Sequence, residues 1–224
     1  LQLMYELSEY LKEISGMDAV SLQPAAGAHG ELTGVMLMKA YFDKKKEKRT
    51  KMLIPDSAHG TNPATVTMCG FSCVQLKSNS NGSIDLDDLK SKMDSDVIGL
   101  MLTNPNTLGI FDDTILEIIQ IVHDRGGLVY CDGANLNANM GIVRPGDLGF
   151  DVLHFNLHKS FSTPHGCGGP GAGPIGVKNI LAEFLPNPRI VKTGTGYSLD
   201  YSQKNSIGRV KAFYGNFAML DRAY

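Results

Sequence analysis

Short apolar segments alternate with segments of helical periodicity between residues 51 and 156, and this alternation limits the possible folds more than any other feature of the sequence. Apolar runs of this length predict strands, and the amphipathic segments between them predict helices. Strands separated by helices pair in parallel, so we expect an α/β fold in which helices cover both faces of an open parallel or mixed sheet. The predicted strands are 51–55, 71–76, 97–102, 128–131 and 152–156, and the predicted helices are 62–69, 86–93 and 112–125.

Two further helices are predicted before this region. Apolar residues at helical spacing, followed by Gly16, predict a helix over residues 2–15 that ends in a left-handed glycine. A second helical pattern covers residues 31–42, and a turn of small residues at 25–30 precedes it. Sheets of this kind bind ligands at the carboxyl ends of their strands, so the residues that follow the strands are the candidates for chemistry.

The character of the sequence changes after the last of these strands. Residues 163–176 contain six glycines and three prolines, a density that predicts a long structured loop. Residues 207–224 begin a new helical pattern. We expect an incomplete large domain at residues 1–185, followed at residues 186–224 by a connector and the start of a truncated C-terminal domain. Because the chain starts at Leu1, inside a helical pattern, we interpret it as part of a longer protein.

Composition excludes several classes of function. The 21 Lys and Arg residues against 23 Asp and Glu residues give a net charge of −2, which leaves no broad positive surface for nucleic acid. No apolar stretch reaches the roughly 18 residues that a membrane span needs. The four cysteines include no Cys-x-x-Cys pair and follow no apolar leader, which indicates neither a zinc site nor a disulfide framework. We therefore expect no metal and a reducing compartment such as the cytoplasm.

An aspartate and a lysine follow two of the predicted strands. Asp132 comes directly after strand 128–131, and Lys159 lies 27 residues later, just beyond strand 152–156. Pyridoxal phosphate (PLP) needs these residue types, a lysine for its Schiff base and an aspartate that keeps the pyridine nitrogen protonated. The alternative is a buried structural ion pair or a solvated lysine, which is the commoner situation for any lone Asp and Lys.

The turn at residues 25–30 supplies the third element that such a cofactor needs. Unpaired N–H groups at a helix start favour a phosphate dianion, and Gly27 and Ala28 are small enough for close approach. His59 follows strand 51–55, where its imidazole could stack on a pyridine ring. Taken singly, these features are also compatible with an ordinary glycine-rich turn and a solvated loop histidine.

Five ordered motifs together resemble the PLP-dependent glycine decarboxylases, the P-proteins of the glycine cleavage system, in particular the catalytic subunit 2 of the bacterial two-subunit form. The resemblance runs from the first helix to the end of the chain. The motifs are QPAAGAHGE at 23–31, DSAHGTNPA at 56–64, TNPNTLG at 103–109, CDGAN at 131–135 and NLHKSF at 156–161, the last followed by TPH at 163–165.

The resemblance implies the large-domain fold of the aspartate aminotransferase class, fold type I of PLP-dependent transferases, which is a three-layer αβα sandwich. It also implies a role for each matching residue. Lys159 matches the Schiff-base lysine, Asp132 the partner of the pyridine nitrogen, and Ala134 the residue beneath the ring. The other matches are His59 as the stacking histidine, Gly27, Ala28 and His29 as the phosphate turn, and Thr107 as a residue near the phenolic oxygen of the cofactor.

His158 precedes the matching lysine, and three interpretations of it stay open. It shapes the surroundings of Lys159, it carries a proton, or it is a packed histidine without a role in chemistry. One position departs from the family pattern: Cys167 stands between Gly166 and Gly168, where a glycine is usual. A side chain there is costly if the backbone needs a positive φ.

The resemblance implies an activity and partners as well. The expected reaction is decarboxylation of glycine, with transfer of the aminomethyl group to the lipoyl arm of the H-protein. The expected assembly is a heterotetramer with the homologous P-protein subunit 1, and a piece of this length is expected to turn over glycine poorly. Two alternatives remain, another PLP-dependent amino-acid decarboxylase or transaminase of fold type I, and a non-catalytic scaffold half. Lys159 speaks against the scaffold.

Overall fold

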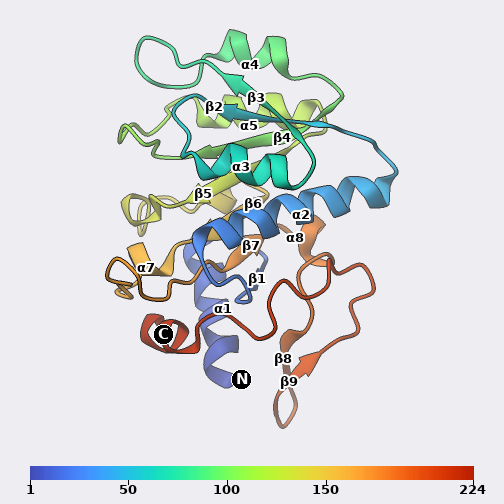
Figure 1. Cartoon of the computed structure of the whole chain (residues 1–224), viewed down its shortest axis with the longest axis vertical. Coiled ribbons are helices and arrows are strands. Elements are labelled where there is room, and N and C mark those ends of the chain that lie inside the picture. The colour runs from blue at the N-terminus through green and yellow to red at the C-terminus, as the bar shows by residue number, and fades with distance from the viewer.

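The computed structural model describes all residues from 1 to 224 and shows three layers, with helices on both faces of a central sheet (Figure 1). Seven strands form this sheet in the order β1-β7-β6-β5-β4-β2-β3. Strands β2 to β6 are parallel, whereas β7 runs antiparallel to both β6 and β1. The expected α/β fold with a mixed sheet is therefore confirmed. The strands are β1 (Ala19–Ser21), β2 (Lys51–Pro55), β3 (Ser72–Leu76), β4 (Val97–Thr103), β5 (Leu128–Gly133), β6 (Val152–Phe155) and β7 (Ile175–Val177).

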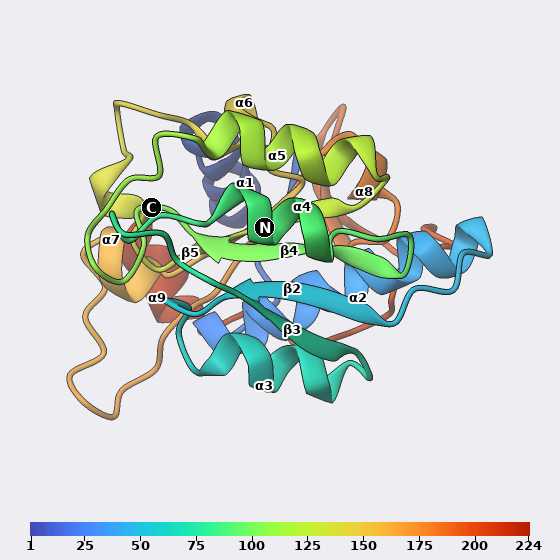
Figure 2. The ribbon, with the colours of Figure 1, turned by 90° about the horizontal axis from the view of Figure 1, so that it is seen from above.

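The helices divide between the two faces of the sheet, as the view from above shows for α4 and α5 on one side and α2 and α3 on the other (Figure 2). None of them combines the length and the apolar character needed to span a bilayer. The helices are α1 (Gln2–Ser15), α2 (Gly27–Lys45), α3 (Thr61–Met68), α4 (Leu86–Lys92), α5 (Ile115–Asp124), α6 (Pro145–Leu148), α7 (Leu157–Ser160), α8 (Asn179–Ala182) and α9 (Phe217–Ala223), with a 3-10 turn at Leu136–Ala138.

Each face of the sheet has its own apolar core, because successive residues of a strand point to opposite faces. Leu100 and Val129 pack toward α1, α4 and α5 in one cluster of buried side chains. Their neighbours Met101 and Tyr130 pack toward α2 and α3 in the other. A strand buried on both faces must be apolar throughout, which is why β4 and β5 are continuous apolar runs rather than alternating ones.

The structure corrects the predicted start of the second helix. We expected a turn at residues 25–30, but α2 begins at Gly27, so most of that turn is the first part of the helix. Because glycine is a poor helix former, the sequence predicted a helix only from residue 31, four residues after the start of α2. These glycines permit close packing: a Cβ at Gly34 would lie 2.3 Å from Tyr130 Cε2, and one at Gly30 would lie 2.7 Å from the carbonyl oxygen of Gly173.

The structure also corrects the predictions for the last third of the chain. The glycine-rich loop ends at residue 174, because Ile175 and Gly176 belong to β7, a strand that pairs on both sides. A two-stranded hairpin, β8 (Arg189–Thr193) and β9 (Gly196–Asp200), occupies most of the expected connector. Of the helical segment expected at 207–224, only Phe217–Ala223, which form α9, are helical. Strands of three to five residues with mixed composition give too weak a periodic signal to be found in sequence.

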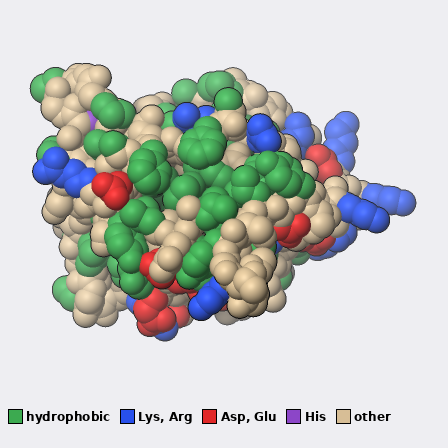
Figure 3. Space-filling model, turned by 90° about the horizontal axis from the view of Figure 1, so that it is seen from below, with side chains coloured by type: hydrophobic (Ala, Val, Ile, Leu, Met, Phe, Trp, Pro, Cys, Tyr) green, Lys and Arg blue, Asp and Glu red, His purple; other side chains and the backbone are tan.

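Residues 186–224 pack against α1. Tyr214 and Leu220 are buried in the same core cluster as Leu7 and Leu11 of that helix. Figure 3 shows hydrophobic side chains gathered on the face that α1, α9 and the β8–β9 hairpin form. The exposed large hydrophobic residues from these parts of the chain are Tyr10, Tyr201, Phe213, Phe217 and Tyr224.

We expect Gly34→Ala to destabilise the fold. Alanine improves helix propensity by about 1 kcal/mol, but its Cβ would overlap the buried ring of Tyr130. Overpacking of this kind outweighs propensity, so the free energy of unfolding should fall by about 1–2 kcal/mol. Urea denaturation measures the change, with Lys39→Ala at an exposed site of the same helix as the control. A Gly34→Ala midpoint at or above the wild-type value would show that the packing is looser than described.

Cys167 has φ of 62°, so this exposed residue occupies a left-handed conformation that favours glycine. We expect Cys167→Gly to raise the free energy of unfolding by up to about 1 kcal/mol, because it removes the strain of the Cβ. Cys167→Ala removes only the thiol and keeps the Cβ, and should leave stability unchanged. Equal midpoints for the two variants in urea would contradict the strain at this position.

Candidate active site

Three polar side chains lie side by side at the carboxyl ends of β4, β5 and β6. Thr103 pairs with Asp132 across β4 and β5, and Asp132 pairs with His154 across β5 and β6. All three are buried and point to the same face as Met101 and Tyr130, two residues earlier on their strands. The strand register therefore places a carboxylate between an imidazole and a hydroxyl.

A cavity of about 300 Å³ opens above these residues. Eight of the nine site residues predicted from sequence line it, which are Gly27, Ala28, His59, Thr107, Asp132, Ala134, His158 and Lys159. The lining residues that sequence reasoning missed are Glu31, Thr61, Thr103, Asn135, His154 and Asn156. The missed residues all lie inside the quoted motifs or on the strands that precede them, but only the register and the helix packing turn them toward the cavity.

Asp132 is held as a carboxylate although it is only 3% exposed. Asn62 Nδ2 donates to its Oδ2 at 3.0 Å, and the backbone N–H of Ala134 donates to its Oδ1 at 2.9 Å. Burial opposes the charge, but His154 and these two donors outweigh it, and the pKa of Asp132 lies below its usual value. Because His154 is itself neutral near pH 7, the two N–H donors are the contacts that hold Asp132 ionised at that pH.

His154 is enclosed completely by its neighbours. Its Nε2 lies 3.3 Å from Asp132 Oδ1, and its Nδ1 lies 2.7 Å from the hydroxyl of Tyr130. Burial lowers the pKa of His154, so the ring is neutral near pH 7. Asn156 Nδ2 lies 2.8 Å from the same Nε2 and donates to it, so a neutral ring carries its proton on Nδ1 and donates it to the hydroxyl of Tyr130. His154 thus lies between the carboxylate and the packed face of the sheet.

The first turn of α2 faces the cavity with unpaired donors. The first backbone N–H of this helix that has a partner is that of Gly30, bonded to the Ala26 carbonyl, so the N–H groups of Gly27, Ala28 and His29 have none. The imidazole of His29 does not line the cavity, and its Nδ1 accepts from the backbone N–H of Ala25. Of these three residues, Gly27 and Ala28 line the cavity and His29 does not.

His59 and Thr107 reach the rim of the cavity from two loops. Thr107 donates to the carbonyl of Ser57 at 2.6 Å and so joins the loop after β4 to the loop after β2. His59 Nδ1 lies 2.7 Å from the hydroxyl of Thr61, which fixes the plane of its exposed ring. Both residues lie where the sequence placed them, at the edge of one site.

Lys159 and His158 belong to α7, the short helix that follows β6. The ammonium of Lys159 is exposed and has no ion pair or side-chain hydrogen bond within the chain. His158 Nδ1 lies 3.2 Å from the carbonyl of Ala172 in the glycine-rich loop, and burial lowers its pKa, so it is neutral near pH 7. A neutral ring donates from Nδ1 to that carbonyl and holds the loop beside Lys159.

A family model described as aminotransferase class-V matches residues 33–188, well over half of the sequence. The chain belongs to this family. It is 59% identical over its whole length to a protein of Alkaliphilus oremlandii named probable glycine dehydrogenase (decarboxylating) subunit 2, and 60% identical to the protein of that name from Pelodictyon phaeoclathratiforme. Each alignment covers 46% of the relative, so the chain spans about half the length of the curated relatives it matches. The resemblance inferred from the five motifs is confirmed.

Two solved structures share the fold of this chain. A glycine decarboxylase (P-protein) of the glycine cleavage system in inhibitor-bound form matches with a TM-score of 0.76 at 19% identity, over all of this chain and 51% of the other. A NifS-like protein matches with a TM-score of 0.69 at 16% identity, over 99% of this chain and 56% of the other. At these identities the likeness shows the fold alone, and it confirms fold type I.

The residues around the cavity fit PLP, the cofactor of these enzymes. Three unpaired N–H groups at a helix start suit a phosphate, and the buried carboxylate of Asp132 suits a protonated ring nitrogen. Lys159 has a side-chain amine without another partner, as covalent attachment requires. The Oγ1 of Thr103 is buried without a hydrogen-bond partner, which leaves a polar atom at the floor of the cavity for a ligand.

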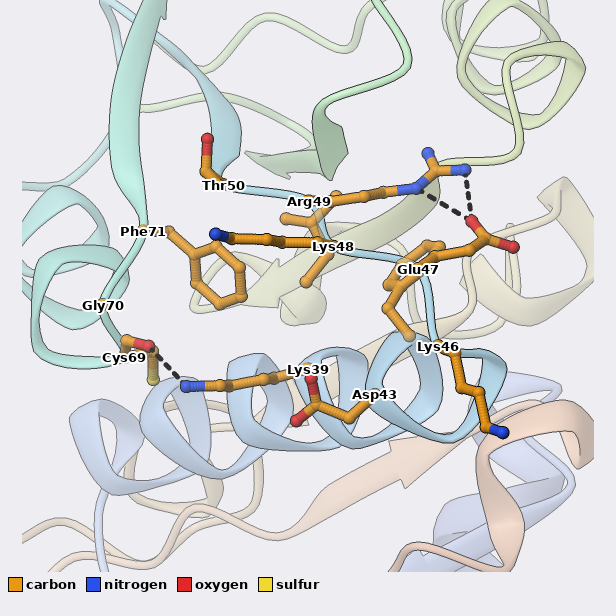
Figure 4. A pocket seen from close by; sticks show the side chains of 12 residues that line it. Lys39, Asp43, Lys46, Glu47, Lys48, Arg49, Thr50, Cys69, Gly70 and Phe71 are labelled. Atoms are coloured by element: carbon orange, nitrogen blue, oxygen red, sulfur yellow. Dashed lines mark hydrogen bonds and ion pairs between the residues drawn. The ribbon is translucent and has the colours of Figure 1, made fainter.

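A second and larger cavity of about 450 Å³ lies at the opposite edge of the sheet, at the amino ends of β2 and β3 (Figure 4). Two of its cationic side chains already have partners: Arg49 pairs with Glu47, and Lys39 donates to the carbonyl of Cys69. None of the predicted site residues lines it. Because ligands of such sheets bind at the carboxyl ends of the strands, the smaller cavity is the candidate active site.

We expect Asp132→Asn to weaken PLP binding at least about tenfold, because the amide lacks the charge that attracts a protonated ring nitrogen. Absorbance titration of the purified chain with PLP measures the affinity. The matched control is Asp151→Asn, which removes another buried carboxylate, hydrogen-bonded to His123 and to the N–H of Val129 outside the cavity. Wild-type affinity in Asp132→Asn, or equal losses in the two variants, would count against a direct role for Asp132.

Proposed function

We propose that this chain is the PLP-binding part of a glycine decarboxylase, which removes the carboxylate of glycine and passes the aminomethyl group to the lipoyl arm of an H-protein. The observation that carries the proposal is a single cavity that joins a buried ionised Asp132, the uncommitted amine of Lys159 and the unpaired N–H groups of α2. The choice of glycine rests on relatives about 59% identical that are named glycine dehydrogenase (decarboxylating) subunit 2.

PLP, when bound, supplies an electron sink for the electron pair left when the bond to the substrate carboxylate breaks. Asp132 holds a proton on the pyridine nitrogen, and the donors from Asn62 and Ala134 keep its carboxylate charged while it does so. The N–H groups of Gly27, Ala28 and His29 bind the phosphate at the positive end of α2. These contacts fix the cofactor at both ends.

The remaining residues hold the ring and the reacting amine. His59 and Ala134 would hold the pyridine ring between them. Lys159 would hold the cofactor through Nζ, and its amine would take up or return a proton during the reaction. His158, neutral and bonded to the glycine-rich loop, ties this loop to the short helix that carries Lys159.

The proposal extends to partners and location. The relatives carry the words "subunit 2" in their names, which supports a second, homologous subunit in a heterotetramer. A lipoylated H-protein is the acceptor that the proposed reaction requires. We place the assembly in the bacterial cytoplasm, where the four free cysteines would stay reduced.

The first test asks whether PLP attaches to Lys159. Borohydride reduction of the chain with PLP, followed by peptide mass mapping, should find the label on Lys159. Lys159→Arg should lose the label, whereas Lys178→Arg, at a lysine that donates to the Gly16 carbonyl away from the cavity, should keep it. A label on any other lysine in the wild-type chain would overturn the assignment.

The second test concerns the substrate. A protein of the relatives' full length that contains these residues, assembled with its partner subunit and a lipoylated H-protein, should exchange labelled bicarbonate into the carboxyl group of glycine. The 224-residue chain should exchange it poorly. Alanine and serine serve as competing substrates that share every group of glycine that reacts. Exchange with either one in preference to glycine would point to a different amino-acid decarboxylase on the same site.

A further inference from the structure

Glu31, Thr61 and His59 form a chain of two hydrogen bonds from the interior of the cavity to its rim. Glu31 of α2 is 4% exposed, whereas His59 lies exposed in the loop before α3. The hydroxyl of Thr61, the first residue of α3, is 2.7 Å from Glu31 Oε1 and 2.7 Å from His59 Nδ1. A buried carboxylate is thereby connected to the imidazole at the cavity mouth.

The single hydroxyl proton of Thr61 cannot serve both bonds. If the hydroxyl donates to Glu31, Nδ1 of His59 must carry a proton and donate to the hydroxyl oxygen. If the hydroxyl donates to His59, Glu31 must carry the proton. The backbone N–H of Thr61 lies 3.2 Å from the same Nδ1 and becomes a donor to it in this second arrangement. The geometry contains donors for both arrangements, and the charge of Glu31 decides between them.

We propose that Glu31 is a positioning residue that acts through Thr61 to set which nitrogen of His59 carries the proton. With Glu31 ionised, the proton of a neutral His59 resides on Nδ1, and Nε2 is left as the basic atom of the ring. The inference rests on the proposed function only in that it concerns the same cavity. The proposal assigns roles to Glu31 and Thr61, for which the sequence motifs predicted none.

The same contacts provide a path for a proton that reaches Nε2. Once Nε2 has bound this proton, the ring is a cation. The Thr61 oxygen then takes the proton from Nδ1, and the former hydroxyl proton of Thr61 bonds to Glu31 Oε1. The electron pair of the broken Nδ1–H bond returns to the ring, so a cationic His59 and an anionic Glu31 become two neutral groups. Thr65, whose hydroxyl lies 3.3 Å from Glu31 Oε2, remains a donor to Glu31 in both states.

The other ionisable groups that face these three residues are Asp132, His154, Lys159 and His158. Asp132 and His154 have ligand atoms within 4.8 Å of those of Glu31. The pKa of Asp132 is lowered and that of the buried His154 is lowered too, so the first stays anionic and the second neutral near pH 7. Lys159 and His158 face the same cavity from α7, and the pKa of His158 is also lowered.

The test reads the histidine directly in the chain without cofactor. Nitrogen-15 NMR of labelled histidine, recorded between pH 5 and 8.5, reports the tautomer and the titration of His59, which His59→Gln assigns. The wild type should hold the proton on Nδ1 near pH 7. Thr61→Val should lose this preference, because the ring loses its hydrogen-bonded link to Glu31.

Three further variants make the result decisive. Glu31→Gln should abolish the tautomer preference as Thr61→Val does, and it serves if the valine variant does not fold. Thr61→Ser keeps the hydroxyl and should restore the wild-type pattern. Thr65→Val, the matched control, removes a hydroxyl that contacts Glu31 but not His59, and should leave the tautomer unchanged.

A wild-type His59 with its proton on Nε2 would overturn the proposal. The proposal would also fail if the tautomer stayed the same in Thr61→Val and Glu31→Gln. Because the measurement needs neither PLP nor glycine, an enzyme that failed to exchange bicarbonate would contradict the proposed function without altering this result.

Discussion

The buried carboxylate of Asp132 is the group on which the rest of the site depends. A charge at this depth is strongly unfavourable unless donors surround it. The donors come from two separate elements, Asn62 in α3 and the N–H of Ala134 just after β5. The strand register and the seating of α3 on the sheet must therefore both be correct before this carboxylate can stay ionised.

Close contact between backbones gives the cavity its second fixed point, the start of α2. A Cβ at Gly173 would lie 1.9 Å from the carbonyl oxygen of Ala26, and one at Gly27 would meet Asn156 Oδ1. Only glycine permits these distances, so the glycine-rich loop and the end of β6 hold the helix start against the strand ends. The glycines weaken α2 as an isolated helix, and its packing against Tyr130 and Val152 compensates.

The charges around the cavity are divided in a way that suits a cationic ring bound next to a free amine. Asp132 provides a fixed negative charge, while burial keeps His154 and His158 neutral near pH 7. No carboxylate forms an ion pair with Lys159, although Asp132 and Glu31 line the same cavity. This lysine can therefore bind a ligand without first breaking an ion pair.

The sequence by itself determined the elements with a strong period and the residues that follow them. Strand β2 and helix α1 have the predicted bounds, and Asp132 and Lys159 lie at the strand ends where the motifs placed them. Their chemical roles remain predictions. The tertiary structure alone decided that β7 joins the sheet, that His154 and Glu31 turn toward the cavity, and that Asn62 turns toward Asp132. Periodicity and local motifs are properties of neighbouring residues, whereas register and helix seating depend on contacts between residues tens of positions apart, which no local pattern encodes.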